Sequence, residues 1–186
     1  MEQTFDFSEI RPYEGEEVAA AAARLCGEEL FRKAVAYVVP DTETFFRVLA
    51  SCRTVDDFQL QLALPCLKAL VKNTSAGLTA SGFSALSPQK CYTYISNHRD
   101  ITLDSAFLNV ALHEAGLDTC EIAIGDNLLI YPWIVDFVRL NKSFIVNRSV
   151  SRRQMLEVSC RLSAYMHHAI HDKKQSIWIA QREGRA

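Results

Sequence analysis

Four short apolar segments alternate with longer amphipathic segments through the second half of the chain, and this alternation constrains the fold more than any other feature. The apolar segments are expected to be strands, at residues 91–96, 121–125, 143–148 and 176–181. The segments between them repeat apolar residues at helical spacing and are expected to be helices, at residues 100–115, 131–139 and 152–171. Because strands that alternate with helices form βαβ units, the sequence predicts an α/β fold with a largely parallel sheet flanked by helices.

Residues near the helix ends support these boundaries. Gly116 is expected to close the first helix, because glycine adopts the left-handed conformation without strain. Pro132 is expected in the first turn of the second helix, where its missing N–H is not needed. Ser151 and Gln154 have the spacing of a capping box at the start of the third helix.

Residues 1–86 have a different pattern and are expected to form an N-terminal helical region. Asp41 and Thr54 are expected to cap two of its helices, and Pro65 is expected to kink the last one. Residues 73–90 are rich in small and turn-forming residues and are expected to be a linker. The sequence therefore predicts a helical region at residues 1–86 and an α/β domain at residues 87–186.

Composition narrows the class of protein. The six cysteines are scattered without a C-x-x-C pair, which favours reduced thiols in a cytosolic protein over a disulfide framework or a zinc site. The N-terminus lacks the pattern of a secretory signal, and no apolar run approaches ~20 residues. The net charge of −2 conceals an acidic first third and a basic segment from Arg139 onward. Most of these charges are expected to be solvated, but a basic segment suits an anionic partner such as phosphate, coenzyme A or an acidic lipid surface.

The strongest candidate for chemistry is His98, on the predicted turn between the strand at 91–96 and the helix at 100–115. In α/β sheets, ligands bind at strand ends. A carboxylate close to an imidazole fixes its tautomer and raises its basicity, as a general base requires. Asp104 is the first choice for that carboxylate and Asp100, which could also cap the helix, is the second. The structural alternative is a histidine that only stabilises the turn.

The letters of His98-Arg99-Asp100 also resemble the catalytic loop of protein kinases, but that interpretation fails. Ser105 stands where the loop requires asparagine, no G-x-G-x-x-G occurs, and Asp136-Phe137 is followed by valine instead of glycine.

Three motifs in order resemble the glycerolipid acyltransferases, which acylate glycerol-3-phosphate and 1-acylglycerol-3-phosphate. The first is Asn97-His98 followed by Asp104, with five residues between histidine and aspartate where the family has four. The second is Gly125 followed by a hydrophobic strand that ends at Arg148. The third is the strand at 176–181 followed by Glu183-Gly184-Arg185, whose arginine stands one place early. The resemblance covers residues 87–186 and is greatest to a bacterial branch.

The resemblance implies a role for each motif residue. His98 would take the proton from a glycerol hydroxyl, which attacks the thioester directly, and Asp104 would orient His98. Arg148 would bind phosphate, Glu183 would bind glycerol hydroxyls, and Gly184 would let the backbone approach the ligand. Arg185 would help to hold phosphate, with Arg182 as the alternative. No cofactor or metal is implied, and the acyl donor would be acyl-CoA or acyl carrier protein.

Other histidines and tryptophans are expected to be structural. His167, His168 and His171 lie opposite the apolar stripe of their predicted helix, so we expect them on its solvent face and not at a metal. Trp133 and Trp178 are expected in the core.

The sequence thus predicts a cytoplasmic O-acyltransferase of phospholipid synthesis, peripheral on the inner face of the cell membrane. Its partners would be an acyl donor, a glycerol-phosphate acceptor and an anionic membrane surface, and not nucleic acid. The alternative is a non-catalytic fragment that binds lipid or phosphate. Because the family's domain continues beyond the third motif, we also expect a truncated chain with little acyl transfer of its own and a frayed end after about Gln181.

Overall fold

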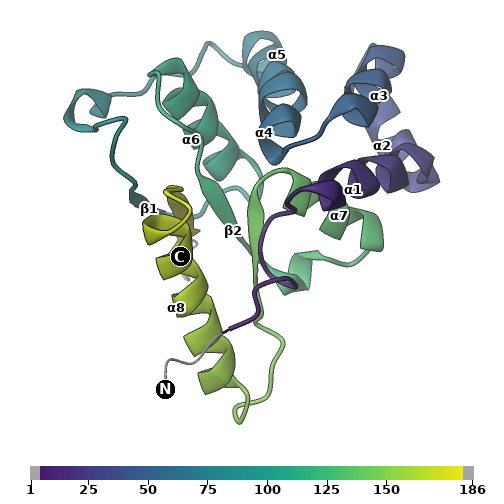
Figure 1. The fold of residues 1–186 in the computed structure, drawn as a ribbon. Coiled ribbons are helices and arrows are strands. Elements are labelled where there is room, and N and C mark those ends of the chain that lie inside the picture. The colour runs from purple at the N-terminus through teal and green to yellow at the C-terminus, as the bar shows by residue number, and fades with distance from the viewer. Residues whose placement is uncertain (1–4, 182–186) are drawn as a thin grey trace. The chain divides into compact units, whose positions relative to one another are not determined.

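A computed structural model describes residues 5–181 of the chain (Figure 1). The chain divides into two compact units. One, the helical unit, contains Pro12–Ser75 and Leu129–Ser143. The other, the sheet unit, contains the rest of the chain. Each is described by itself.

The helical unit is built from short amphipathic helices. They are α1 (Glu16–Gly27), α2 (Glu29–Val38), α3 (Thr42–Ser51), α4 (Val55–Phe58), α5 (Leu64–Thr74) and α7 (Pro132–Leu140). Of these, α2, α3 and α4 have side-chain caps at their N-termini. Asp41 caps α3 by accepting a hydrogen bond from Thr44 N at 3.0 Å, and Thr54 caps α4 through a capping box with Asp57. Both predicted caps are confirmed. The apolar faces meet in one core that includes Val18, Leu25, Phe31, Leu49, Phe58 and Leu140.

Near Pro65, where a kink is expected, the structure has a π-helical segment, Gln59–Ala63, directly before the start of α5. Proline has no N–H for the regular helical ladder, and its ring clashes with the carbonyl four residues earlier. A wider turn just before Pro65 accommodates both restrictions without ending the helix.

A polar network holds α7 against α1 within the helical unit. Arg24 donates two hydrogen bonds to Asp136, at 2.9 and 2.6 Å, and Tyr13 Oη donates to the same carboxylate at 2.6 Å. The guanidinium of Arg139 lies 4.1 Å above the ring of Tyr13. This pairing places α7 among helices from the first part of the chain, although it follows a strand of the sheet in the sequence. The domain boundary expected at residues 86 and 87 stays a prediction.

The sheet unit contains the four expected strands, β1 (Thr93–Ser96), β2 (Glu121–Gly125), β3 (Ser143–Val146) and β4 (Ile177–Ala180). Their order across the sheet is β1-β4-β2-β3. β4 pairs in parallel with β1, where Thr93 lies opposite Ile177, and with β2, where Glu121 lies opposite the same residue. The predicted α/β fold with a parallel sheet is confirmed.

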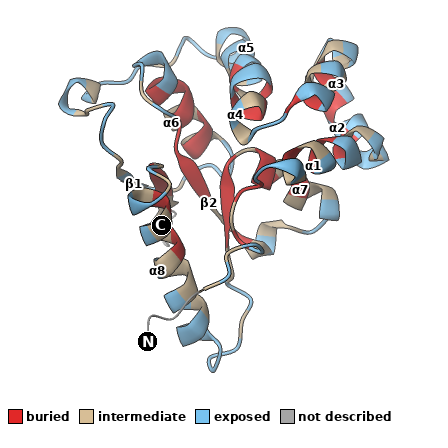
Figure 2. Ribbon diagram, viewed as in Figure 1, coloured by how far each residue is buried: buried red, intermediate tan, exposed pale blue. Residues whose placement is uncertain are grey.

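Two helices cover the two faces of this sheet. Leu112 of α6 (Leu103–Glu114) packs with Ile122 and Trp178 in one cluster. Tyr165 of α8 (Met155–His171) donates a hydrogen bond to Glu121 at 2.5 Å. Because Glu121 and Ile122 are successive residues of β2, their side chains point to opposite faces, so α6 and α8 lie on opposite sides. Figure 2 shows β2 and the adjoining side of α6 as buried.

Of the three helix ends predicted in the second half of the chain, two are confirmed. Gly116 ends α6 at φ +74°, with its own N–H bonded to His113 O and the next N–H, of Leu117, bonded to Leu112 O. Pro132 is the first residue of α7, as predicted. The capping box expected at the start of α8 is wrong, because Ser151 Oγ donates to Gln154 Oε1 and the helix begins only at Met155. The two side chains satisfy each other and leave the backbone uncapped.

Candidate functional site

The residues predicted to act lie along one edge of the sheet. Because the strands are parallel, their carboxyl ends share an edge, where α/β sheets bind ligands. His98 lies two residues after β1, Asp126 lies directly after β2, and Arg148 lies two residues after β3. The strand order places β1 and β3 at the two sides of the sheet. Three strand spacings, roughly 14 Å, therefore separate the strands that carry His98 and Arg148.

His98 contacts a carboxylate from the start of α6. Its Nδ1 lies 3.2 Å from Asp104 Oδ2. The same oxygen accepts hydrogen bonds from Arg99 N at 2.7 Å and Asp100 N at 3.0 Å. The loop after β1 thus folds around one carboxylate oxygen, which fixes the position of the imidazole. Five intervening residues therefore still bring histidine and aspartate into contact.

Asp104 is held in its charged form. Partial burial acts to raise its pKa, but the hydrogen bonds from the Asp100 and Arg99 backbone and from His98 outweigh burial and lower the pKa below its ordinary value. Its place in the first turn of α6 adds the favourable end of the helix dipole. The group beside His98 is therefore an anion at neutral pH, able to orient an imidazole and stabilise its cation.

Asp100, the second candidate for this carboxylate, has a different structural position. Its Oδ1 accepts hydrogen bonds from Thr102 N at 2.9 Å and Leu103 N at 2.7 Å. These bonds shape the turn that leads into α6. Of the two candidates, Asp104 is the one whose carboxylate lies against the His98 ring.

The ring of Trp178 packs against the ring of His98. The two rings lie edge to face, with centroids 5.9 Å apart, and Trp178 is only 3% exposed. The indole Nε1 donates to Ser96 Oγ at 3.1 Å, which ties β4 to the residues just before His98. The expectation that Trp178 is a core residue is confirmed. Its contact with His98 was missed because it depends on the pairing of strands far apart in the sequence, for which there is no local signal.

At the other side of the sheet, Asp126 and Gly125 position Arg148. Asp126 accepts hydrogen bonds from Arg148 N at 3.0 Å and Ser149 N at 3.3 Å, and so holds the segment after β3. A Cβ on Gly125 would lie 3.1 Å from Arg148 Nε and would also collide with the Asn127 side chain. Glycine therefore leaves room for the arginine stem against the backbone. Asp126 had not been predicted as a site residue, although it directly follows Gly125 in the second motif.

The guanidinium of Arg148 is exposed and forms no ion pair with any residue between 5 and 181. An exposed guanidinium without an ion-pair partner can donate two parallel hydrogen bonds to the oxygens of a phosphate or carboxylate. Glu183, Gly184 and Arg185, with the alternative Arg182, lie outside the described residues. They follow β4, which lies between β1 and β2, and the last described residue, Gln181, donates its N–H to Ser96 O at 2.9 Å.

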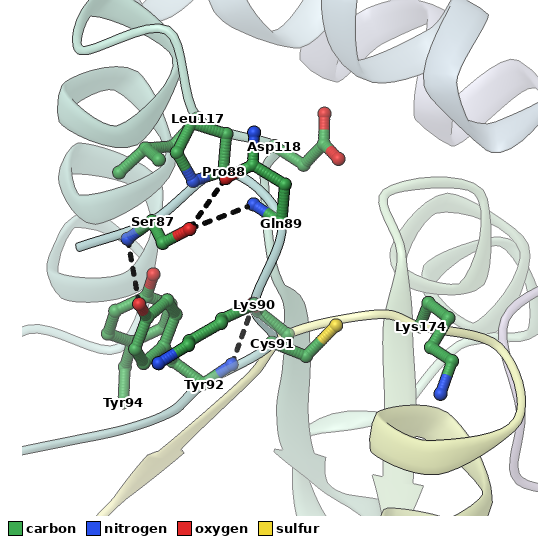
Figure 3. A pocket seen from close by; sticks show the side chains of 11 residues that line it. Ser87, Pro88, Gln89, Lys90, Cys91, Tyr92, Tyr94, Leu117, Asp118 and Lys174 are labelled. Atoms are coloured by element: carbon green, nitrogen blue, oxygen red, sulfur yellow. Dashed lines mark hydrogen bonds between the residues drawn. The ribbon is translucent and has the colours of Figure 1, made fainter.

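A pocket of about 210 Å³ lies at the opposite edge of the sheet (Figure 3). Its lining comes from the segments that precede β1, β2 and β4, and includes Lys90, Tyr92, Asp118 and Lys174. None of the predicted site residues lines it. The pocket is therefore separate from the strand ends that carry His98 and Arg148.

Two of the three α8 histidines lie on the solvent face as expected, but His168 is partly buried, with its ring stacked on that of Phe7 at 5.4 Å. His167 and His171 are exposed with their rings stacked 4.2 Å apart, and His168 Nδ1 lies 2.7 Å from Asp172 Oδ2. Residues 5–181 contain no cluster of three or more side chains suited to hold a metal. Within the same range, no helix is long and apolar enough to cross a membrane.

Comparison with known protein families gives one match. The model of a family described as Acyltransferase matches residues 78–182, more than half of the chain. The matched region contains His98, Asp104, Gly125 and Arg148 together with the strands that carry them. A search of curated proteins found no match.

Proposed function

Since the chain belongs to the Acyltransferase family, we propose that it transfers a fatty acyl group to a glycerol-phosphate hydroxyl in phospholipid synthesis. The acyl donor is acyl-CoA or acyl carrier protein, and the acceptor is glycerol-3-phosphate or 1-acylglycerol-3-phosphate. The observation that supports this proposal most is the contact between His98 Nδ1 and Asp104 Oδ2 at the carboxyl edge of the sheet.

In the proposed reaction, His98 is the general base. When Nδ1 donates its proton toward Asp104, Nε2 carries the lone pair and can take the proton of the acceptor hydroxyl. The hydroxyl oxygen attacks the thioester carbonyl, and the tetrahedral intermediate expels the thiolate. The imidazolium then returns its proton to the thiolate, so that His98 ends the cycle neutral. Asp104 stabilises the imidazolium in between.

Arg148 is proposed to bind the phosphate of the acceptor, because its guanidinium is exposed and unpaired within the described part of the chain. The acceptor would then lie along the carboxyl edge, between the ends of β3 and β1. Glu183, Gly184 and Arg185 stay predicted contacts to the glycerol hydroxyls and the phosphate. We place the protein in the bacterial branch of the glycerolipid acyltransferases and at the inner face of the cell membrane.

The direct test measures thiol release from acyl-CoA, with glycerol-3-phosphate and 1-acylglycerol-3-phosphate as separate acceptors. Acceptor-dependent thiol release, with the acylated product identified by mass spectrometry, is the expected result. Vesicle binding is measured on the same preparation. Binding without acyl transfer from acyl-CoA or acyl carrier protein would favour the non-catalytic alternative.

Replacement of each aspartate by asparagine tests which one partners His98. Asp104→Asn keeps an acceptor oxygen for the loop but removes the charge that stabilises the imidazolium, so we expect kcat to fall about tenfold, or ~1.4 kcal/mol. Asp100→Asn keeps the acceptor for Thr102 N and Leu103 N and should change kcat by less than about twofold. A larger loss in Asp100→Asn would assign the role to Asp100 instead.

Gly125→Ala tests whether the glycine positions Arg148. The new methyl group would collide with the Asn127 side chain and crowd Arg148 Nε, 3.1 Å away, so we expect the KM for the phosphorylated acceptor to rise about two- to tenfold, as for a weakened hydrogen bond. The KM for the acyl donor should not change. Gly27→Ala is the matched control, because no atom lies within 4 Å of a Cβ at that exposed helical glycine. An unchanged acceptor KM in Gly125→Ala would contradict the positioning role.

A further inference from the structure

We propose that the start of α8 and the segment before it form a membrane-docking surface for anionic lipid. This surface would hold the carboxyl edge of the sheet, where His98 and Arg148 lie, against the bilayer. This docking surface consists of Arg152, Arg153, Met155 and Leu156. The inference rests on the proposed function for its biological role, but the surface is defined by the exposure and charge of these four residues.

The apolar part of the docking surface has no partner within residues 5–181 that covers it. Met155 is 45% exposed and Leu156 is 75% exposed, although they open a helix whose later residues Tyr165 and Ala169 are fully buried. Two adjacent large apolar side chains left in water lose the stabilisation that burial would give them. Figure 2 shows this end of α8 and the loop that leads into it as exposed.

The charged part of the docking surface directly precedes the apolar part. Arg152 and Arg153 are exposed, and neither makes an ion pair with a residue in the described part of the chain. The nearest acidic residue in the sequence is Glu157, so the two arginines leave a positive balance at this end of the helix. Arginines beside exposed apolar side chains match a membrane interface, where the cations meet anionic headgroups and the apolar groups enter the acyl boundary.

The position of the docking surface connects it to the site. The segment between β3 and α8 projects beyond the sheet at the lower end of Figure 1. Arg148 lies on this segment, four residues before Arg152. Ile101, on the loop that carries His98 at the same edge of the sheet, is 57% exposed. A bilayer held by the docking surface would therefore lie beside the carboxyl edge, so that an acylated acceptor could enter from the membrane and not from water.

The test compares vesicle binding of two double variants and their matched controls. Arg152→Gln/Arg153→Gln removes two charges, and Lys90→Gln/Lys174→Gln removes two exposed charges at the opposite edge of the sheet. We expect the first pair to weaken binding to phosphatidylglycerol-containing vesicles about 30-fold, or about fivefold per arginine, and the control pair to have less than about a twofold effect. Arg152→Lys/Arg153→Lys should keep binding within about twofold of the wild type, since the charge is retained.

Met155→Ser/Leu156→Ser tests the apolar part and should weaken binding at least about tenfold, on neutral as well as anionic vesicles. Tyr37→Ser/Val38→Ser is its control, because these two residues are also exposed but belong to the helical unit. Equal binding by the docking-surface variants and their controls would overturn the proposal. So would binding by the wild type that is no tighter to anionic than to neutral vesicles.

The failure of this inference can be separated from the failure of the proposed function. Vesicle binding is measured without acyl transfer, so it tests the docking surface even if the protein proves inactive. If the protein is active, transfer to water-soluble glycerol-3-phosphate should be unchanged in Arg152→Gln/Arg153→Gln. Transfer to 1-acylglycerol-3-phosphate embedded in anionic vesicles should fall in parallel with binding. Loss of both activities to the same extent would show damage to the site and overturn the docking role.

Discussion

Replacement of His98 by alanine is expected to lower kcat for acyl transfer at least about 100-fold and leave the fold intact. A positioned general base contributes roughly 10²- to 10⁴-fold to a rate, and alanine has no group that can take the hydroxyl proton. His98 lies in a loop with its side chain 33% exposed, so its removal opens no cavity in the core. The measurement is kcat at saturating acyl donor and acceptor, with the melting temperature determined in parallel.

His113→Ala is the matched control for this experiment. His113 is an exposed residue in the last turn of α6, the helix that also carries Asp104, and it should be replaceable without loss of turnover. Turnover close to the wild type in His98→Ala would refute the proposed mechanism. Wild-type protein without acyl transfer, combined with intact vesicle binding, would instead point to the non-catalytic lipid-binding alternative.

The second large effect is expected for Arg148→Ala, in the KM for the phosphorylated acceptor. A hydrogen bond between charged groups is worth about 1.5–3 kcal/mol, which corresponds to a rise of about 10- to 150-fold. The KM for the acyl donor should change far less, because Arg148 is proposed to bind the phosphate of the acceptor and not the thioester of the donor. Arg148→Lys should recover only part of the affinity, since an ammonium retains the charge but not the two-pronged geometry.

Arg47→Ala serves as the control for Arg148→Ala, because it removes another exposed arginine, in the helical unit. Equal rises of the KM for donor and acceptor in Arg148→Ala would assign a structural role to this side chain. The contrast with Gly125→Ala is also informative. Both changes should act on the same acceptor KM, but the glycine variant only crowds the Arg148 side chain and should have the smaller effect.

Local features of the sequence determined the elements of the fold. The apolar alternation in residues 91–181 places each strand and helix of the sheet unit within a few residues of its observed bounds. Gly116 and Pro132 mark helix ends because their backbone restrictions act on their own residues and near neighbours. The capping box failed at Ser151 and Gln154 because a motif of two polar side chains allows them to bond to each other instead of to the backbone.

The candidate site could be predicted only as far as its parts are local. His98 and Asp104 are six residues apart, and a single turn brings them together, so the sequence was sufficient to suggest the pair. Arg148 could be placed at a strand end because the apolar segment that precedes it is also a local feature of the sequence. The sequence left the choice between Asp104 and Asp100 open, because both lie within reach of a tight turn. Only the folded loop decides which carboxylate lies against the ring.

Tertiary structure decided everything that depends on strand order. The insertion of β4 between β1 and β2 brings Trp178 beside His98 and separates the strands that carry His98 and Arg148. Asp126 meets the backbone of Arg148 across 22 residues because β2 and β3, the strands that precede them, are neighbours in the sheet. The packing of α7 against α1 likewise depends on Asp136 meeting Arg24 and Tyr13. Periodicity within a segment specifies which side of it is apolar, but not which distant segment will cover that side, because that choice is made by packing of the whole chain.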